Sequence, residues 1–279
     1  MNRSLCHYGR IALLGGALLG SAAFTSASAE GLLFAEPVAV TTGGTNVFQQ
    51  TNKEKRRSIM QNTEIAVDFA RGKWNPADWM VFKSVRFDYT HEFVQMDDHI
   101  QNPCPPGLSD EEIYAKHVTD VYASIVWPER LVGSTIQVSS TMSFDHLMAP
   151  LIVITPELDK DDQGRPAFKK HYEVVLYNEG LNVWHYTYEN GKLSWHLAAF
   201  ARAPFEPNRR YELKVTMARG KREMRMTVEC GGVKFGFEDP ELPSAFYAGV
   251  TGCEGRNRFY DFKAKTSDGR LDPSSDGEH

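Results

Sequence analysis

Short runs of alternating hydrophobic and polar residues, separated by turn-forming residues, dominate the chain from residue 61 onward. In the clearest run, residues 136–144, the even-numbered positions are Ile, Val, Ser, Met and Phe. Period-two alternation is typical of a half-buried β-strand, and repeated short runs without helical stretches between them indicate an all-β fold. Further strands are expected at 151–154, 171–177, 181–188, 193–202, 210–218, 223–230, 233–237, 246–251 and 259–265. The pattern therefore predicts one β-sandwich domain over residues 61–266.

Few segments depart from this pattern. The capping box Ser109-Asp110-Glu111-Glu112 predicts a short helix that ends near Lys116, inserted on the rim of the sandwich. Residues 30–60 are expected to form an entry segment that precedes the sandwich and contains one or two edge strands. The charged loop at 159–165 is predicted to be mobile, and the polar tail 267–279 to be disordered.

The N-terminus has the features of a secretory signal. Arg3 and Arg10 make a basic start before an apolar stretch at 11–20, and small residues then end in Ala27-Ser28-Ala29, a typical cleavage site. Ten apolar residues are too few for a membrane span, which needs about 20. Residues 1–29 are therefore predicted to be a signal peptide, with an uncleaved anchor as the alternative. The mature protein is expected in the periplasm or outside the cell, without membrane contact.

Charge and cysteine content narrow the possible partners. The net charge is -5, and loss of Arg3 and Arg10 with the signal would make it -7. A negative chain without a clustered basic face argues against nucleic acid as a partner. Of the remaining cysteines, Cys230 and Cys253 each end an expected strand and could form a disulfide if those strands are neighbours. The cysteine spacing argues against a zinc site.

Two turn signals predict the register of three strands. Asn190-Gly191 is typical of a two-residue hairpin and places His185 opposite His196. A three-residue loop that ends at Gly180 would place Glu173 opposite His185.

This register divides the side chains between two faces of the sheet, because successive residues of a strand point to opposite sides. The expected core face is Tyr172, Val174, Leu176, Trp184, Tyr186, Tyr188, Leu193, Trp195 and Leu197. The opposite face carries a polar row of Glu173, His185 and His196. Three interpretations of the row remain open: a solvated or hydrogen-bonded surface, a histidine acid–base pair oriented by Glu173, or a divalent metal site. If the two faces were inverted, the aromatic residues would line a groove instead.

Two of these strands also carry a resemblance to a known family. The stretches 181–188 (LNVWHYTY) and 195–199 (WHLAA) resemble the YesU-like family of bacterial concanavalin A-like proteins. Residues 126–129, 142–144, 247–250 and 259–262 are similar to the same family, so the resemblance covers roughly 120–265. It implies a concanavalin A-like jelly roll of two antiparallel sheets, whose concave face receives a glycan.

Together these features predict a polysaccharide lyase or glycoside hydrolase, with acidic glycans among the candidate substrates. His185 and His196 would transfer protons, supported by Glu173 and Tyr177. The expected substrate contacts are His171, Arg202 and Arg209. No cofactor is expected apart from the divalent metal considered above.

Two other classes of function remain open: a non-catalytic glycan-binding protein of the same fold, and a structural envelope protein. Unpaired polar groups at the base of a deep cleft would favour the enzyme. A shallow face with coplanar, exposed aromatic rings would favour the binding protein.

Overall fold

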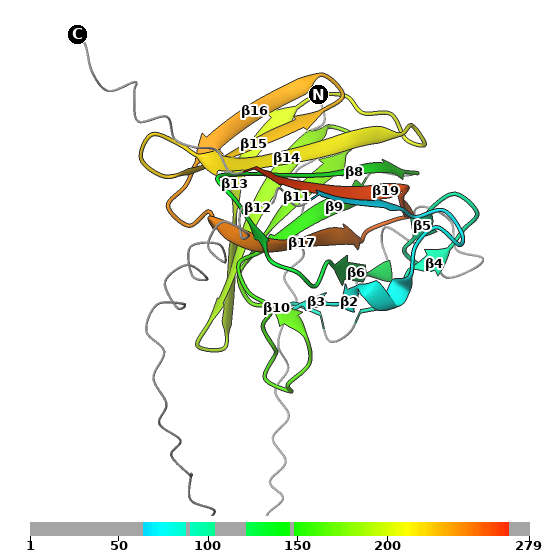
Figure 1. Cartoon of the computed structure of the whole chain (residues 1–279), viewed down its shortest axis with the longest axis horizontal. Coiled ribbons are helices and arrows are strands. Elements are labelled where there is room, and N and C mark those ends of the chain that lie inside the picture. Colours follow the sequence, from blue (N-terminus) through cyan, green and yellow to red (C-terminus); the bar gives the residue numbers. More distant parts are fainter. Residues whose placement is uncertain (1–63, 88–89, 104–120, 146–147, 268–279) are drawn as a thin grey trace, which may run out of the picture. The chain divides into compact units, whose positions relative to one another are not determined.

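The computed structural model describes residues 64–87, 90–103, 121–145 and 148–267 (Figure 1). The predicted signal peptide, the segment 30–60, the helix at 109–116 and the tail from 268 lie outside these residues. Within them the regular structure is β, apart from one 3-10 turn at Pro76–Asp78.

One of the two main sheets has nine antiparallel strands. Its central path runs through β16 (Val233–Glu238), β15 (Met224–Cys230), β14 (Tyr211–Arg219), β8 (Thr135–Phe144), β18 (Asn257–Phe259), β5 (Ile100–Gln101) and β4 (Val94–Gln95). β19 (Asp261–Ser267) also pairs with β8, and β1 (Glu64–Asp68) pairs with β19.

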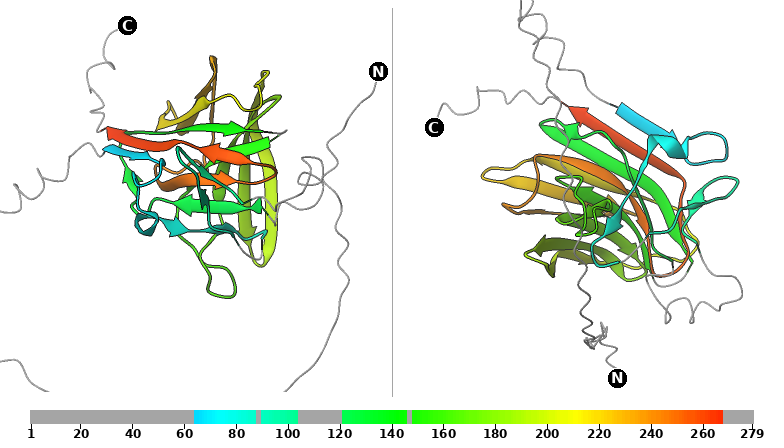
Figure 2. Two further views of the ribbon diagram at one scale, coloured as in Figure 1. Left: turned by 90° about the vertical axis from the view of Figure 1, so that its right-hand side faces the viewer. Right: turned by 90° about the horizontal axis from the view of Figure 1, so that it is seen from below.

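The other main sheet has eight antiparallel strands, and β13 forms its edge. Its path runs through β13 (Lys192–Arg202), β12 (Gly180–Glu189), β11 (His171–Tyr177), β9 (Met148–Thr155), β17 (Ala245–Gly252), β6 (Ala123–Val126) and β2 (Met80–Val81). β7 (Leu131–Val132) pairs with β17. The long β12–β13 hairpin, yellow-green in Figure 2, stands at one side of this sheet.

The main core lies between the two sheets. It takes alternate residues from facing strands, for example Val138 and Met142 from β8 with Ile152 and Val174 from β9 and β11. This arrangement confirms the predicted all-β sandwich of two antiparallel sheets. The strands expected from residue 136 onward are present, although the run at 259–265 is divided between β18 and β19 at Tyr260.

The eight-stranded sheet also packs on its other face, here called the outer face. A second cluster of buried residues lies there, including Leu151, Val153 and Val175, which alternate with the core residues of β9 and β11. Phe82 of this cluster directly precedes β3 (Lys83–Ser84), and Phe168 belongs to β10 (Ala167–Phe168). These two short strands form a parallel ladder. Part of the outer face is therefore covered by chain rather than open.

The predicted register is confirmed for one hairpin and wrong for the other. Asn190 and Gly191 have positive φ angles of 53° and 74°, and His185 lies opposite His196 as expected. In the preceding hairpin, however, Gly180 pairs with Tyr177, so the loop has two residues rather than three. Glu173 consequently lies opposite Trp184, not opposite His185.

The reason is that Gly180 belongs to a strand and not to the turn. It pairs with Tyr177 on one side and with Arg202 on the other. A Cβ atom at this position would lie 2.2 Å from the carbonyl oxygen of Ala201. The glycine is required by close approach of the neighbouring strand, which a turn-based interpretation of the sequence does not consider.

This one-residue difference inverts the predicted faces of β12 and β13. Leu181 and Val183 point into the core, whereas Trp184 packs in the outer cluster. By alternation, the other aromatic residues of β12 and β13 expected in the core, Tyr186, Tyr188 and Trp195, lie on the outer face as well, whereas Tyr172 of β11 is in the core as predicted.

The structure also tests the predictions for the charged loop and for the two cysteines. The charged loop at 159–165 is anchored, because Asp161 forms an ion pair of 2.9 Å with the buried ammonium group of Lys83. Cys230 and Cys253 are both buried, free thiols, so no disulfide joins them in the structure.

Candidate functional site

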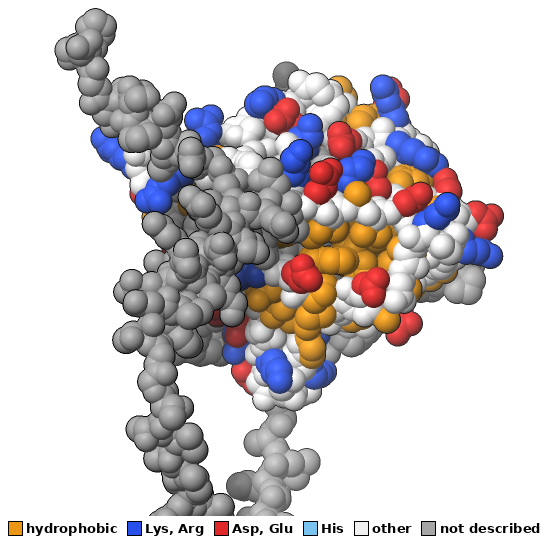
Figure 3. All heavy atoms as spheres, viewed as in Figure 1, with side chains coloured by type: hydrophobic (Ala, Val, Ile, Leu, Met, Phe, Trp, Pro, Cys, Tyr) orange, Lys and Arg blue, Asp and Glu red, His pale blue; other side chains and the backbone are white. Residues whose placement is uncertain are grey.

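Exposed hydrophobic side chains are concentrated on the edge strand β13. Seven large hydrophobic residues are exposed in the described part of the chain, and three of them belong to this strand: Trp195 (55 % exposed), Leu197 (39 %) and Phe200 (58 %). Apolar side chains also reach the surface elsewhere (Figure 3), so exposure alone does not identify a site. What distinguishes β13 is that its exposed residues form one line on one face.

A β-bulge produces this alignment. Val183 pairs with Ala199 and Trp184 pairs with Leu197, which leaves Ala198 as an extra residue in β13. Strict alternation would place residues 195 and 197 on one face and residues 200 and 202 on the other. The bulge reverses the alternation at Ala198, so that both pairs lie on the outer face. We call Trp195, Leu197, Phe200 and Arg202 the β13 stripe.

Aromatic rings extend from the stripe into the sheet. His171, Tyr186 and Trp195 are paired across β11, β12 and β13. The rings of Tyr186 and Trp195 are inclined by 23°, with centroids 6.4 Å apart, and those of His171 and Tyr186 by 6° at 4.8 Å. His171 and Tyr186 are buried. The row is therefore a stack of nearly parallel rings whose outermost member is open to solvent.

An ion pair lies directly beside this stack. Arg86 donates to both carboxylate oxygens of Glu173, at 3.1 and 3.2 Å, and to the hydroxyl oxygen of Tyr186 at 2.8 Å. Nε2 of His171 lies 3.3 Å from the same carboxylate. The Glu173 side chain is almost completely enclosed, whereas about a quarter of the Arg86 side chain is exposed.

The charges of this cluster are set by burial and by one another. Burial disfavours ionisation of Glu173, but the Arg86 guanidinium and the His171 contact together hold its pKa below the usual range. Burial also lowers the pKa of His171, and Arg86 adds to this effect. The arrangement therefore favours an ionised Glu173, a charged Arg86 and a neutral His171.

The opposite face of the same hairpin carries the other two histidines of the predicted row. The ring of His185 stacks on Tyr172 with centroids 4.2 Å apart, and its Nε2 atom lies 3.5 Å from the Glu241 carboxylate. Burial lowers the pKa of His185, while Glu241 opposes that effect. The exposed His196 ring meets His185 edge to face.

The polar row predicted from the sequence is thus divided between two faces. Glu173 points outward beneath the aromatic stack, whereas His185 and His196 point to the inner side. Glu173 therefore cannot orient His185, because the sheet itself separates them. The expectation of one site containing Glu173, His185 and His196 is wrong.

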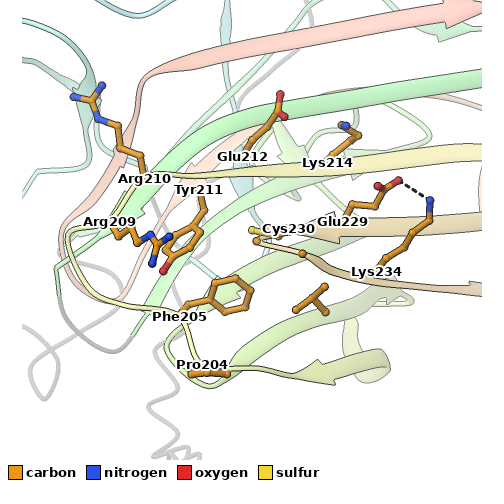
Figure 4. A pocket seen from close by; sticks show the side chains of 13 residues that line it. Pro204, Phe205, Arg209, Arg210, Tyr211, Glu212, Lys214, Glu229, Cys230 and Lys234 are labelled. Atoms are coloured by element: carbon orange, nitrogen blue, oxygen red, sulfur yellow. Dashed lines mark ion pairs between the residues drawn. The ribbon is translucent and has the colours of Figure 1, made fainter.

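The remaining predicted residues fall into two places. Tyr177 and Arg202 lie in one row of the outer face, on either side of Gly180. Arg209 lies just before β14, at an open cleft of about 680 Å³ that β14, β15 and β16 help to line. There its guanidinium lies over the ring of Tyr211, and Lys234 forms an ion pair of 3.1 Å with Glu229 (Figure 4).

Two kinds of feature are absent from the part of the chain that the structure describes. No group of three or more His, Cys, Asp or Glu side chains there has the geometry to hold a metal ion. No helix there is long and apolar enough to cross a membrane.

Arg86 is the main residue that sequence reasoning missed. It lies in the turn that follows β3, in a short segment whose sequence has no clear hydrophobic periodicity. Its only sequence signal is a pair of cations, Lys83 and Arg86, among aromatic residues. Both cations prove to be largely buried against carboxylates, Asp161 and Glu173.

Comparisons with known proteins give structural neighbours only. No family model matches the chain, and no curated protein matches it by sequence. A carbohydrate-binding module, CBM66, from Bacillus subtilis aligns at 14 % identity over 68 % of this chain and 92 % of that chain, with a TM-score of 0.39. The exoplasmic/lumenal domain of VIP36, in a form bound to Ca²⁺ and Man3GlcNAc, aligns at 14 % identity over 72 % and 88 %, with a TM-score of 0.47. Peanut lectin aligns at 9 % identity over 74 % and 98 %, with a TM-score of 0.46.

Proposed function

We propose that this protein binds a glycan on the outer face of the β12–β13 hairpin. The observation that carries the proposal is the exposed ring of Trp195, stacked nearly parallel to Tyr186 on an open sheet face. A flat aromatic surface packs well against the apolar face of a sugar ring. Exposed apolar patches bordered by polar groups mark interaction sites.

Polar groups beside the stripe suit a ligand rich in hydroxyl groups. Asn182 lies beside Phe200 on the same face, and Arg202 ends the stripe. An amide supplies both donors and acceptors, and a guanidinium supplies several donors. A mixture of ring surface and hydrogen-bonding groups is what a sugar requires of its site.

Binding fits the geometry better than catalysis. Glu173 and His171 are enclosed, so that a ligand on the stripe would touch neither side chain. These two side chains thus support the stack rather than face solvent. A binding protein is expected to have a shallow face with coplanar, exposed aromatic rings. The row of Tyr186 and Trp195 comes closest to that description, because its outermost ring is exposed.

One observation favours an enzyme as the second candidate. Glu254 has a positive φ of 58°, and burial raises its pKa, while the pKa of Glu173 is lowered. Both carboxyl groups interact electrostatically with Arg86. Two carboxyl groups whose pKa values are shifted in opposite directions are a feature of glycoside hydrolases and related enzymes.

The wider setting is also part of the proposal. The N-terminal signal features support a location outside the cytoplasm, where polysaccharides are met. The resemblance of residues 181–188 and 195–199 supports placement in the YesU-like family.

The test is binding of the protein to a panel of neutral and acidic polysaccharides, with Trp195→Ala and His196→Ala as a matched pair. The two rings are exposed on the same strand but on opposite faces. We expect Trp195→Ala to weaken binding roughly tenfold or more, as loss of an aromatic anchor does, and His196→Ala to leave it unchanged. Equal affinity of the wild type and Trp195→Ala would overturn the proposal.

The same panel separates binding from catalysis. Release of reducing ends or of unsaturated uronate, abolished by Glu254→Gln, would establish the second candidate in place of a binding protein. Tight binding without either product supports the first.

A further inference from the structure

We propose that the end of the β13 stripe near Arg202 binds the carboxylate of an acidic sugar, so that the ligand is an anionic, uronate-type glycan. This inference rests on the proposed function and names the class of glycan. The subsite consists of Tyr177, Gly180 and Arg202 in one row, with Asn182 and Phe200 in the next.

The register places these five residues on one face. Tyr177 pairs with Gly180, and Gly180 with Arg202; in the next row Asn182 pairs with Phe200. The bulge at Ala198 brings Phe200 and Arg202 onto the outer face, where Tyr177 and Asn182 already point. Arg202 and Phe200 are exposed, and Tyr177 and Asn182 are partly exposed, so a ligand can reach all four side chains.

Gly180 lies buried in the middle of its row and carries no side chain between Tyr177 and Arg202. The strands that carry these two residues flank β12, and they are therefore about 10 Å apart. Any larger residue at Gly180 would collide with the backbone of Ala201, so this close packing of the strands, and with it the spacing of Tyr177 and Arg202, depends on the glycine.

Arg202 differs in its charge partners from Arg86, Arg209 and Arg210. Arg86 is paired with Glu173, Arg209 with Glu206, and Arg210 with Asp98. Across the described ranges, no ion pair joins Arg202 to a carboxylate. Glu179, in the adjacent turn, is exposed, but its contact with this strand is through its main chain, which accepts from the Ala203 amide. A guanidinium that is exposed and not neutralised by the protein suits a carboxylate of the ligand, which it can bind through two parallel hydrogen bonds.

The neighbours of Arg202 match the rest of a uronic acid. The Phe200 ring, two residues away on the same face, can pack against the sugar ring while Arg202 holds its carboxylate. The Asn182 amide lies between them and the aromatic stack, within reach of ring hydroxyl groups. From Trp195 to Arg202 the strand runs roughly 20 Å, which allows an oligosaccharide to lie along β13.

The test uses polysaccharides that differ only in charge. Polygalacturonate and alginate are each compared with their fully esterified forms, which keep the sugar rings and linkages but lose the carboxylate. We expect the wild type to bind at least one acidic form roughly tenfold more tightly than its ester. Arg202→Gln should remove that preference, by weakening binding of the acidic form much more than binding of the ester, and Arg202→Lys should restore part of it.

Arg209→Gln is the matched control, because it removes the same charge from the cleft on the other sheet. We expect this variant to keep the preference for the acidic form. A preference lost in Arg209→Gln but kept in Arg202→Gln would overturn the assignment of the subsite.

Two outcomes separate this inference from the proposed function. If acid and ester bind equally well and Trp195→Ala weakens both, the anionic subsite is wrong and the glycan-binding face stands. If neither form binds, and the stripe variants instead change the oligomeric state in sedimentation experiments, both are wrong and the stripe is a contact between copies of the chain.

Discussion

The two faces of the β11–β12–β13 region hold their charged groups in different ways. On the outer face, Glu173 is enclosed with Arg86 beneath an aromatic stack whose last ring is exposed. On the inner face, His185 is buried, but its partner Glu241 is about half exposed and is shared with Lys170 at 3.1 Å. The outer face thus has a largely buried ion pair, Arg86–Glu173, next to an exposed apolar surface. On the inner face, the carboxylate that contacts His185 is itself exposed to solvent.

This difference indicates which face depends on its charges. A buried charge that loses its partner remains in a medium of low polarity, and the cost is several kcal/mol. An exposed charge that loses its partner is hydrated by water, and the cost is small. The same substitution should therefore lower the stability of the protein much more at Glu173 than at Glu241.

The largest effect is expected for Glu173→Gln. Removal of its charge leaves Arg86 largely buried without a counter-ion, which should lower the free energy of unfolding by about 3–5 kcal/mol. The corresponding change on the inner face, Glu241→Gln, should cost at most about 1 kcal/mol. Urea unfolding monitored by tryptophan fluorescence measures both; similar losses in the two variants would show that the faces do not differ in this way.

A smaller effect is expected from acidification between pH 7.5 and 5.5. The pKa of His171 is lowered in the folded protein, so below about 6.5 the unfolded chain binds a proton that the folded chain does not. Stability should therefore fall as the pH decreases through this window, by up to about 1.4 kcal/mol per pH unit for a histidine that stays neutral.

Variants of the two buried histidines sharpen the comparison. Burial lowers the pKa of both histidines, and a carboxylate opposes this effect at each, Glu173 at His171 and Glu241 at His185; His171 is the more completely enclosed of the two. His171→Gln should therefore remove more of the pH dependence than His185→Gln. The opposite order would place the acid-sensitive group on the inner face. The measurement is urea unfolding at both pH values.

The smallest effect on stability is expected at the exposed rings. Trp195→Ala and His196→Ala should each change the free energy of unfolding by about 0.5 kcal/mol or less, because both side chains are mainly in solvent. A large loss of stability in Trp195→Ala would mean that the ring is part of the packing, and its effect on binding would then need another explanation.

Local sequence patterns predicted the strands and one hairpin well. Asn190-Gly191 determined the pairing of His185 with His196, because a two-residue turn with positive φ angles leaves little choice of register. Alternation likewise identified β8 and β11. These features depend on residues close together in the chain.

The site depended on information that is not local. Gly180 was interpreted as a turn residue, although its role is to accept the close approach of Ala201 from the next strand. The bulge at Ala198 depends on how β13 pairs with β12, and the burial of Arg86 depends on Glu173, 87 residues further along the chain. One incorrect loop length was then enough to assign the aromatic residues to the wrong face.

The extra residue at Ala198 makes the surface of β13 sensitive to chain length rather than to composition. Successive side chains of a strand point to opposite faces, and the one extra residue of the bulge reverses this alternation for the rest of β13. Deleting this single alanine would turn Phe200 and Arg202 toward the interior, or pull Trp195 there instead, with every other residue type preserved. A lineage could therefore gain or lose the continuous outer surface through one small deletion, without a single substitution among the residues that form it.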